Sequence, residues 1–539
     1  MAGGDEYQLT AVNRDDKIWM ALGWLGFSAI VLFVATAIGM LLAAGGTEDA
    51  WPPLSYLLRV TLFTFGQALA STVLSVVLAL PAALAVTRRP AFPGRALLLG
   101  LMLVPLGLPV LPAVFGIVEV WGRQGAVNDL FRTFGIEDAL SIYGLAGILI
   151  GHVFFNLPLA ARLMIKALDR VPRDDWRLAA SLDFPRFALF RFVEWPALLR
   201  VIPGIAGLIF MLCVTSFTIV LTLGGGPQTS TLEVAIYQAL KFDFDPPRAL
   251  ALSALQLALT LLVFLFLKLF PDPEQDRGAV QGRAFRTDGA SGLSKFSDSL
   301  VLAPFLAFVG APMIAIIVAG LKADFRHLVA DPLFRQALAT SLFVATAAGV
   351  LCVLLTFLMI RARLAAKGPG IAGLLRLPEF MLLLPPLALG SGWFVLLLKT
   401  GLETHAAIPI VVIINVLMAM PFAARVLGPE LRTHLLRTGR LADSLDIGGL
   451  SRLRLIDWPV LRRPLLTALS FAMALSLGDL GAVALFGSED FITLPALLYA
   501  KLGSYRSTDA AGLALILGLL CLALMLPAVQ SDRRLGELP

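Results

Sequence analysis

The sequence is poor in charged residues, and this lack excludes most soluble folds. Asp, Glu, Lys and Arg make up 15% of its 539 residues, while apolar residues make up 58% and the mean hydropathy is +0.85. A soluble domain cannot bury so large an apolar fraction. The composition therefore predicts an integral membrane protein with many spans.

Cysteine is also scarce, and a phosphate-binding motif is missing. Cys213, Cys352 and Cys521 all lie within apolar runs. They fit neither a disulfide framework nor a CxxC metal site, so we interpret them as small apolar residues. No stretch matches G-x-x-x-x-G-K-[ST]. We therefore expect no ATP hydrolysis, no catalytic residue, no metal and no cofactor in this chain itself.

About twelve apolar runs are long enough to cross a bilayer, which takes roughly 20 residues. They lie at about 18–44, 56–86, 96–121, 143–165, 200–224, 248–270, 299–321, 334–361, 371–398, 406–428, 463–487 and 508–529. Basic residues cluster in the loops that follow the even-numbered runs. The positive-inside rule then places these loops and both termini in the cytoplasm. The net charge of +6 follows from this bias, so it indicates contact with membrane lipid and no nucleic-acid partner.

A polar segment at 271–298, rich in Pro, Gly and Ser, is predicted to be a cytoplasmic linker. The predicted order is a cytoplasmic segment 1–17, a first repeat 18–270, the linker, a second repeat 299–529 and a cytoplasmic tail 530–539. Each repeat has an even number of spans, so the two have the same orientation. The predicted fold is an all-α integral membrane protein of about twelve transmembrane helices, built as two parallel six-helix repeats.

Two cytoplasmic loops repeat each other 263 residues apart, with no residue gained or lost. PLAAR at 158–162 returns as PFAAR at 421–425, RLAASLD at 177–183 as RLADSLD at 440–446, and EWP at 194–196 as DWP at 457–459. Polar loops tolerate changes in length unless a function holds them fixed. The loops 170–200 and 433–463 therefore indicate a docking surface that one kind of partner contacts twice.

A short helix is predicted at about 174–183, with Leu178, Ala179 and Leu182 on one apolar face and Pro185 ending it. The second copy has the equivalent face Leu441, Ala442 and Leu445, ended by Gly448 and Gly449. An ordinary interfacial helix is the alternative, which two copies in register disfavour. On the docking interpretation, we expect a charge at Ala179 or Ala442 to abolish partner binding without unfolding the chain.

These loops resemble the EAA loop of ABC-importer permeases: Glu-Ala-Ala, a Gly six residues after the start and a Pro thirteen after that. Here Arg177 and Arg440 replace the Glu, and Asp183 and Asp446 replace the Gly. Asp accepts a left-handed backbone better than most residues, so the turn can survive. The resemblance implies a coupling segment that docks on a cytoplasmic ATPase. Its residues are Arg177, Leu178, Ala179, Ala180, Leu182, Asp183, Pro196, Arg440, Leu441, Ala442, Leu445, Asp446 and Pro459.

Other strings resemble the fused thiamine ABC transporter permeases over about 50–530. They include HVFFNLP at 152–158, FVEWP at 192–196, LGGGPQ at 223–228 and VALFG at 483–487. In that family one chain in the bacterial inner membrane works with two copies of an ATPase, which uses the ATP, and with a periplasmic thiamine-binding protein. The resemblance implies import of thiamine and its phosphate esters, including thiamine pyrophosphate. The cargo follows from the resemblance alone.

Polar side chains inside the predicted spans are candidates for the substrate pathway, because such residues are costly in a membrane. Asp479 is flanked by Gly478 and Gly481, and it suits either a cationic substrate or the cap of a broken helix. The other candidates are Glu119, His152 and Asn156. For Glu119 a pair with Arg123 is favoured, and for His152 and Asn156 hydrogen bonds between helices are favoured.

Two other functions stay open from the sequence. One is the same machinery in a fused permease with a different cargo, such as ferric iron or another small solute. An ion-coupled secondary transporter with two parallel halves would need no ATPase at the repeated loops. A membrane scaffold without transport gives no reason for Asp479 within a span.

Overall fold

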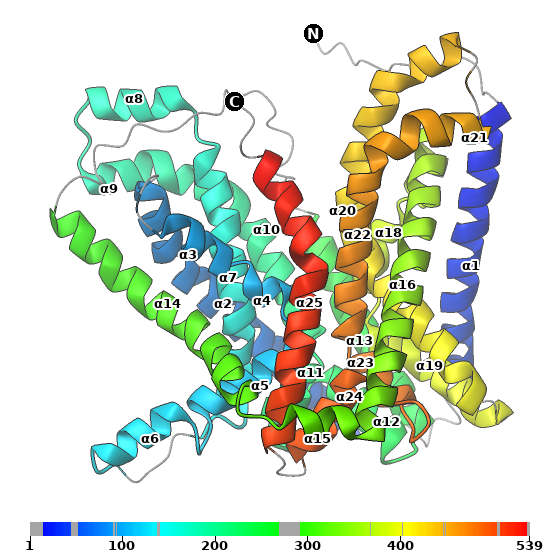
Figure 1. Cartoon of the computed structure of the whole chain (residues 1–539), viewed down its shortest axis with the longest axis horizontal. Coiled ribbons are helices and arrows are strands. Elements are labelled where there is room, and N and C mark those ends of the chain that lie inside the picture. Colours follow the sequence, from blue (N-terminus) through cyan, green and yellow to red (C-terminus); the bar gives the residue numbers. More distant parts are fainter. Residues whose placement is uncertain are drawn as a thin grey trace. The chain divides into compact units, whose positions relative to one another are not determined.

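The structure is a computed structural model that describes residues 14–44, 52–89, 92, 94–136, 141–268, 292–366, 368–401, 403–445, 447, 449–503 and 507–535. Every regular element within these residues is a helix (Figure 1). The predicted all-α membrane fold is therefore confirmed for the described chain. Of the predicted cytoplasmic segments 1–17 and 530–539, residues 1–13 and 536–539 lie outside the described residues.

The described helices form two compact units. The N-unit contains the described residues within 45–334 and 494–519, and the C-unit contains those within 1–44, 335–493 and 520–539. Each unit is described below by itself.

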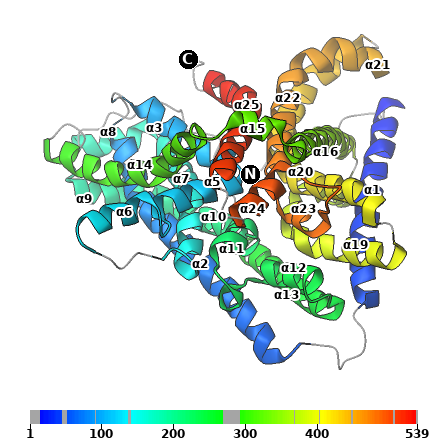
Figure 2. The ribbon, with the colours of Figure 1, turned by 60° about the horizontal axis from the view of Figure 1, so that its bottom comes forward.

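The N-unit is built around α2, which packs against α7 and α10. A second group consists of α12 and α13, which lie side by side (Figure 2). Its elements are α2 (Leu54–Arg88), α3 (Arg95–Leu101), α4 (Val104–Gly107), α5 (Val110–Trp121), α6 (Ala126–Thr133), α7 (Leu145–Asp169), α8 (Arg173–Ser181), α9 (Arg186–Leu189), the π-helical turn η2 (Phe190–Glu194), α10 (Trp195–Val214), α11 (Thr218–Leu223), α12 (Leu232–Lys241), α13 (Pro246–Leu267), α14 (Gly292–Gly320), α15 (Phe325–Ala330), α24 (Leu494–Gly503) and the first part of α25 (Ser507–Leu535).

The C-unit is organised by α20, which packs against α22 and α19. Helix α1 lies along α19, where the rings of Phe33 and Trp393 stack with their centroids 4.7 Å apart. Its elements are α1 (Arg14–Ala44), most of α16 (Pro332–Ala365), α17 (Pro369–Leu374), α18 (Leu377–Phe380), α19 (Pro386–Thr400), α20 (Glu403–Ser444), α21 (Gly449–Arg452), the π-helical turn η6 (Leu453–Asp457), α22 (Trp458–Leu477), α23 (Gly481–Phe486) and the remainder of α25.

Ten described helices are long and apolar enough to cross a membrane, and a bent pair makes eleven. The ten spans are Lys17–Ala43, Leu54–Arg88, Leu145–Asp169, Arg186–Val214, Pro246–Leu267, Ser294–Gly320, Pro332–Ala365, Ala406–Gly439, Leu453–Leu477 and Thr508–Leu526. The sequence predicts about twelve. The remaining two predicted spans, 96–121 and 371–398, do not form single long helices.

Prolines explain why these two runs are broken. The first run bends by 115° between Gly107 and Val110, where Leu108 is extended and Pro109 follows it. A residue before proline is driven out of the helical region, and proline has no N–H to continue the helix. In the second run, Pro385 and Pro386 precede the shorter apolar helix α19, Pro386–Thr400. Each run still contains an apolar helix, but that helix does not extend over the whole predicted span.

The packing units do not follow the predicted repeats. Helix α1, from the first predicted repeat, belongs to the C-unit, whereas α14 and α24, from the second, belong to the N-unit. Residues 292–298, which the sequence assigns to the linker, form the first turns of α14. There Asp298 is buried, is hydrogen-bonded by Arg88, and lies 3.4 Å from nitrogens of both Arg89 and Arg186. This carboxylate ties the start of α14 to the end of α2 and to α9. The repeat boundaries themselves stay a prediction.

Candidate functional site

The first repeated loop forms a separate helix, α8, which is close to the predicted range 174–183. Pro172 precedes it, and Asp174 and Asp175 stand in its first turn, where negative charge stabilises the helix dipole. Arg177 is exposed and lies 3.6 Å from Asp174 on the same helix. The helix ends at Ser181 and the chain turns back at Asp183.

Asp183 produces this turn by adopting a left-handed backbone, with φ = +47°. The Asp183 N–H donates to the carbonyl of Ala180 at 3.2 Å, and the Phe184 N–H donates to that of Ala179 at 3.1 Å. This pair of bonds defines a Schellman motif, which satisfies carbonyls at the end of a helix and usually has Gly at the left-handed position. Asp183 thus stands at the position of the EAA glycine and adopts the left-handed conformation that glycine accepts most readily.

An apolar cluster lies under α8 and connects it to the membrane helices. Its buried residues are Val171, Trp176, Ala179 and Leu189, and Phe184, Val193 and Ala197 pack against them. Ala179 is only 2% exposed. The small side chain of Ala179 therefore allows α8 to pack closely against the rest of this chain. It is not available for contact with a partner.

The predicted apolar face is therefore divided between two sides. Leu178 and Leu182 are 60% and 57% exposed, whereas Ala179 points inward. Ala180 is half-buried. Ala179 is buried rather than facing a partner, so a charge there would enter the apolar cluster, and we now expect it to destabilise the fold. The surface open to a partner is the pair of leucines.

The second repeated loop presents the same pair on a different scaffold. Here the segment is the end of α20, a single helix of 42 residues. Leu441 and Leu445 are 60% and 58% exposed, and Ala442 is fully buried. The N–H of Ile447 donates to the carbonyl of Ala442 at 3.0 Å, the same bond as in the first corner. Asp446 and the side chain of Arg440 lie outside the described residues.

Pro196 and Pro459 also occupy equivalent positions. Each is the exposed second residue of a long helix, α10 or α22, and each follows a π-helical turn, η2 or η6. Proline cannot donate to the preceding turn, and the wider π turn stands where regular α-helical bonding is interrupted. We name the two assemblies of exposed leucines, turn and proline the first and second coupling corners.

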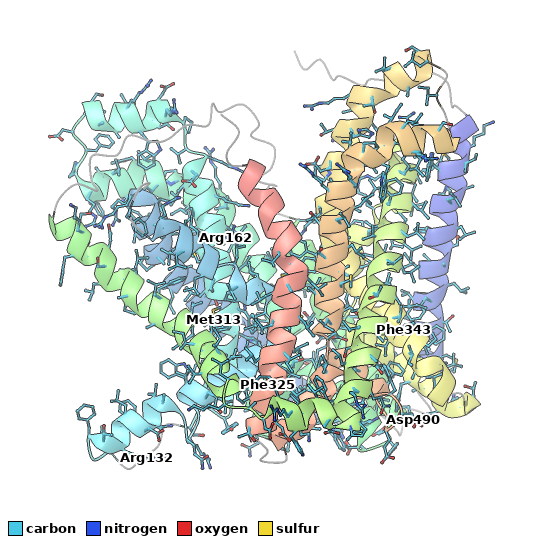
Figure 3. All side chains as sticks on the ribbon, viewed as in Figure 1. Arg132, Arg162, Met313, Phe325, Phe343 and Asp490 are labelled. Atoms are coloured by element: carbon cyan, nitrogen blue, oxygen red, sulfur yellow. The ribbon has the colours of Figure 1, made fainter. Side chains whose placement is uncertain are left out.

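The substrate-pathway candidates are each engaged in local contacts. His152 Nδ1 lies 2.9 Å from the Ser71 hydroxyl, and the Asn156 amide donates to Cys213 Sγ at 3.4 Å. These bonds join α7 to α2 and α10, as interhelical hydrogen bonding predicts. Figure 3 labels Arg162 on the same helix, further toward the α8 end.

Asp479 caps a broken helix in the C-unit. Its Oδ1 and Oδ2 accept from the backbone N–H groups of Gly481 and Ala482 at 3.1 and 3.2 Å, at the start of α23. The side chain is partly exposed. Glu119 and Arg123 form no ion pair among the described residues, so the favoured pairing is not seen.

The structure contains two buried polar clusters that the sequence analysis does not predict. Gln67 and Gln256 donate to the carbonyls of Cys213 and Val214 at the end of α10, and Gln256 also bonds Glu233 at 3.3 Å. In the other unit, His434 Nε2 lies 2.7 Å from Asp457 Oδ1. Polar residues three or four apart in α2, such as Thr64, Gln67 and Ser71, were the available signal for the first group.

The described helices define a multi-pass membrane protein, and a family match gives its class, an inner membrane component of a transport system. Residues 55–272 match the family described as binding-protein-dependent transport system inner membrane component. This match covers most of the first predicted repeat.

Relatives that align over nearly the whole chain identify a more specific family of permeases. The thiamine transport system permease proteins of Brucella abortus (strain 2308) and Escherichia coli (strain K12) are 46% and 45% identical to it. The alignments cover 93% of this chain and 94% and 95% of the relatives. The protein of that name from Haemophilus influenzae is 38% identical over 93% of this chain and 94% of its own length. The chain belongs to this family of ABC-importer permeases.

Proposed function

We propose that this chain is the translocation subunit of an ATP-driven importer for thiamine and its phosphate esters, including thiamine pyrophosphate. The observation that carries the coupling mechanism is the recurrence of one corner, with two exposed leucines, at the same register in both halves. The relatives named thiamine permeases support the cargo.

The proposed partners follow from the same observations. Each coupling corner would dock one copy of a cytoplasmic ATPase, which binds and uses the ATP, while this chain binds no cofactor or metal. A periplasmic thiamine-binding protein would deliver substrate at the opposite side of the membrane. Both termini would lie in the cytoplasm. An ATPase dimer that closes on ATP can shift the permease between two states only if it binds them with different affinity.

Among the pathway candidates, Asp479 suits contact with a cationic substrate best. Its side chain is partly exposed, and its carboxylate is held by two backbone N–H groups. His152 and Asn156 are buried by helix contacts, and we assign them to holding α7 in place. Glu119 remains a weaker candidate at the end of α5.

Uptake in cells tests cargo and energy source together. Labelled thiamine uptake is measured in cells without their own system, with this chain, the ATPase and the binding protein restored together. We expect uptake that requires all three and survives collapse of ion gradients while ATP is maintained. Thiamine monophosphate and pyrophosphate should compete, and ferric iron should not. Competition by iron alone would reassign the cargo, and loss of uptake with the ion gradient would support a secondary transporter.

Charge at the exposed leucines tests the docking surface. We expect Leu178→Asp with Leu182→Asp, or Leu441→Asp with Leu445→Asp, to reduce ATPase co-purification at unchanged thermal stability. Burying about half of two leucine side chains contributes roughly 2 kcal/mol, so each corner should lose at least about tenfold in affinity.

Two matched variants separate docking from folding. Leu130→Asp changes an exposed leucine on α6, whose position at the opposite end of the N-unit from α8 is marked by Arg132 in Figure 3, and should leave ATPase binding unchanged. Ala179→Asp places the charge in the buried cluster and should lower thermal stability. Normal ATPase binding by both double variants would remove the coupling assignment.

A further inference from the structure

The second coupling corner is held by a buried polar pair. His434 lies on α20 and Asp457 ends η6, immediately before α22. His434 Nε2 and Asp457 Oδ1 are 2.7 Å apart, and their side chains are 3% and 5% exposed. Arg452 Nε lies 3.9 Å from the other carboxylate oxygen. A hydrogen bond at this distance and burial is directional, so it fixes how α20 is rotated against η6.

The first corner uses a different interior at the equivalent positions. The residues 263 positions earlier are Val171, which belongs to the apolar cluster, and Glu194, which is buried at the end of η2. The cluster is filled by Trp176, whose counterpart is Gly439. A Cβ at Gly439 would meet nothing within 4 Å. The two corners present the same exposed leucines but are secured by different chemistry.

The connection to the membrane helices also differs. In the first copy, α7 ends at Asp169 and α8 begins only at Arg173, after Pro172. In the second copy, α20 continues without interruption to Ser444. His434 lies seven residues before Leu441, which is about 10 Å along a helix axis. A displacement at the exposed leucines therefore reaches the His434–Asp457 bond through one continuous helix.

We propose that His434 and Asp457 form a positioning pair that transmits movement of the second coupling corner into α22. The bond joins the helix that carries Leu441 and Leu445 to the turn that leads directly into α22, and α22 packs along α20. The first corner has Val171 at the position of His434, and a valine side chain cannot make this hydrogen bond. The pair is therefore a feature of the second corner, although both corners present the same exposed leucines.

This inference rests on the proposed function, because it requires an ATPase at the corner. The test uses the full chain reconstituted in vesicles with the ATPase and binding protein. ATP hydrolysis and labelled thiamine uptake are measured on the same vesicles, together with the amount of bound ATPase. The readout is uptake per ATP hydrolysed, which a merely less stable complex would not change.

Removal of either partner should uncouple hydrolysis from transport. We expect His434→Leu and Asp457→Leu to bind the ATPase normally, hydrolyse ATP and lose about tenfold in uptake per ATP, as for a typical coupling between sites. The double variant should be no worse than either single variant, because both remove the same bond. His434→Gln keeps an N–H donor and should restore most of the uptake. His327→Leu, an exposed histidine on α15, is the matched control and should behave as wild type.

Three results would overturn the proposal. These are unchanged uptake per ATP in both single variants, additive losses in the double variant, and losses that follow reduced ATPase binding or thermal stability. If His434→Leu does not accumulate, Asp457→Glu provides the measurement, because it installs the carboxylate of the first copy and lengthens the side chain by one methylene. It should lower uptake per ATP at normal ATPase binding. Wild-type vesicles without ATP-driven uptake would instead refute the proposed function.

Discussion

Asp183 shows how a single residue shapes the first coupling corner. The EAA pattern has glycine at this position, and Asp183 adopts a left-handed backbone here, with φ = +47°. Residues with a Cβ are strained there, although Asp and Asn are among the more tolerant. The departure from the pattern therefore retains the turn at some cost in free energy.

The strain at Asp183 can be measured by substitution. We expect Asp183→Gly to raise the free energy of unfolding by about 0.5 kcal/mol and Asp183→Val to lower it by about 1–2 kcal/mol, since a β-branched residue is the least tolerated in this region. Ser181→Gly, in the last turn of α8, should instead lower it by about 0.5–1 kcal/mol. Denaturant titration in lipid nanodiscs gives all three values. Equal destabilisation by both glycine variants would show that Asp183 is not strained.

The alanines of the repeated loops pack differently from the sequence prediction. Their small size indicates close approach, and the sequence interpretation assigned that approach to a partner. Ala179 and Ala442 are instead buried against the chain itself. Helical spacing places Leu178, Ala179 and Leu182 on neighbouring directions, and only the position of Trp176 and Leu189 decides which of them faces inward.

Between elements, close contact of helix backbones sets the packing of α1 on α19. A Cβ on Gly392 would lie 2.0 Å from the carbonyl oxygen of Ala37, so no side chain fits between the two helices. Small residues at such positions are what allow apolar helices to approach in a membrane. The Trp393 indole N–H reaches the carbonyl of Phe33 at 3.3 Å in the same contact.

Gly392→Ala should therefore separate α1 from α19. We expect a loss of about 1–3 kcal/mol, as for overpacking of a dense interior, with increased protease sensitivity near α1. Gly39→Ala is the matched change on the exposed side of α1, where a Cβ meets nothing within 4 Å, and it should be neutral or stabilising. Thermal unfolding of the two variants in the same detergent gives the comparison. A neutral Gly392→Ala would mean that α1 can shift without cost.

At the scale of the whole molecule, each compact unit contains helices from both predicted repeats. Helix α1 packs with helices from the second repeat, and α14, anchored through Asp298, packs with helices from the first. Hydrophobic periodicity cannot reveal such an exchange, because any apolar helix is compatible with either group. The two halves of the sequence are therefore not the two halves of the structure.

This exchange makes a prediction for split chains. Fragments 1–280 and 281–539, expressed separately, should each be degraded or protease-sensitive, because each leaves part of a packing unit without its partners. Expressed together they should reassociate and restore membrane levels and thiamine uptake. Immunoblots of membranes after limited proteolysis, beside the intact chain, provide the measurement. A stable, protease-resistant fragment on its own would contradict the exchange.

The chain itself determined the features that depend on local pattern. Apolar length defines the membrane helices, because unsatisfied backbone groups cannot remain in lipid. The repeated PLAAR, RLAASLD and EWP strings located both corners, because their spacing is identical in the two copies. Pro109 and Pro385 mark the breaks in the two interrupted runs, because proline cannot continue a helix.

Only the tertiary structure decided which side chains of those patterns face inward. It exposed Leu178 and Leu441, buried Ala179 and Ala442, and brought His434 to Asp457 across 23 residues of chain. It also decided that α1, from the first predicted repeat, packs in the C-unit and that α14, mostly from the second, packs in the N-unit. The physical reason is that burial and pairing depend on neighbours distant in sequence, whereas helix length, turn chemistry and proline breaks depend on a few consecutive residues.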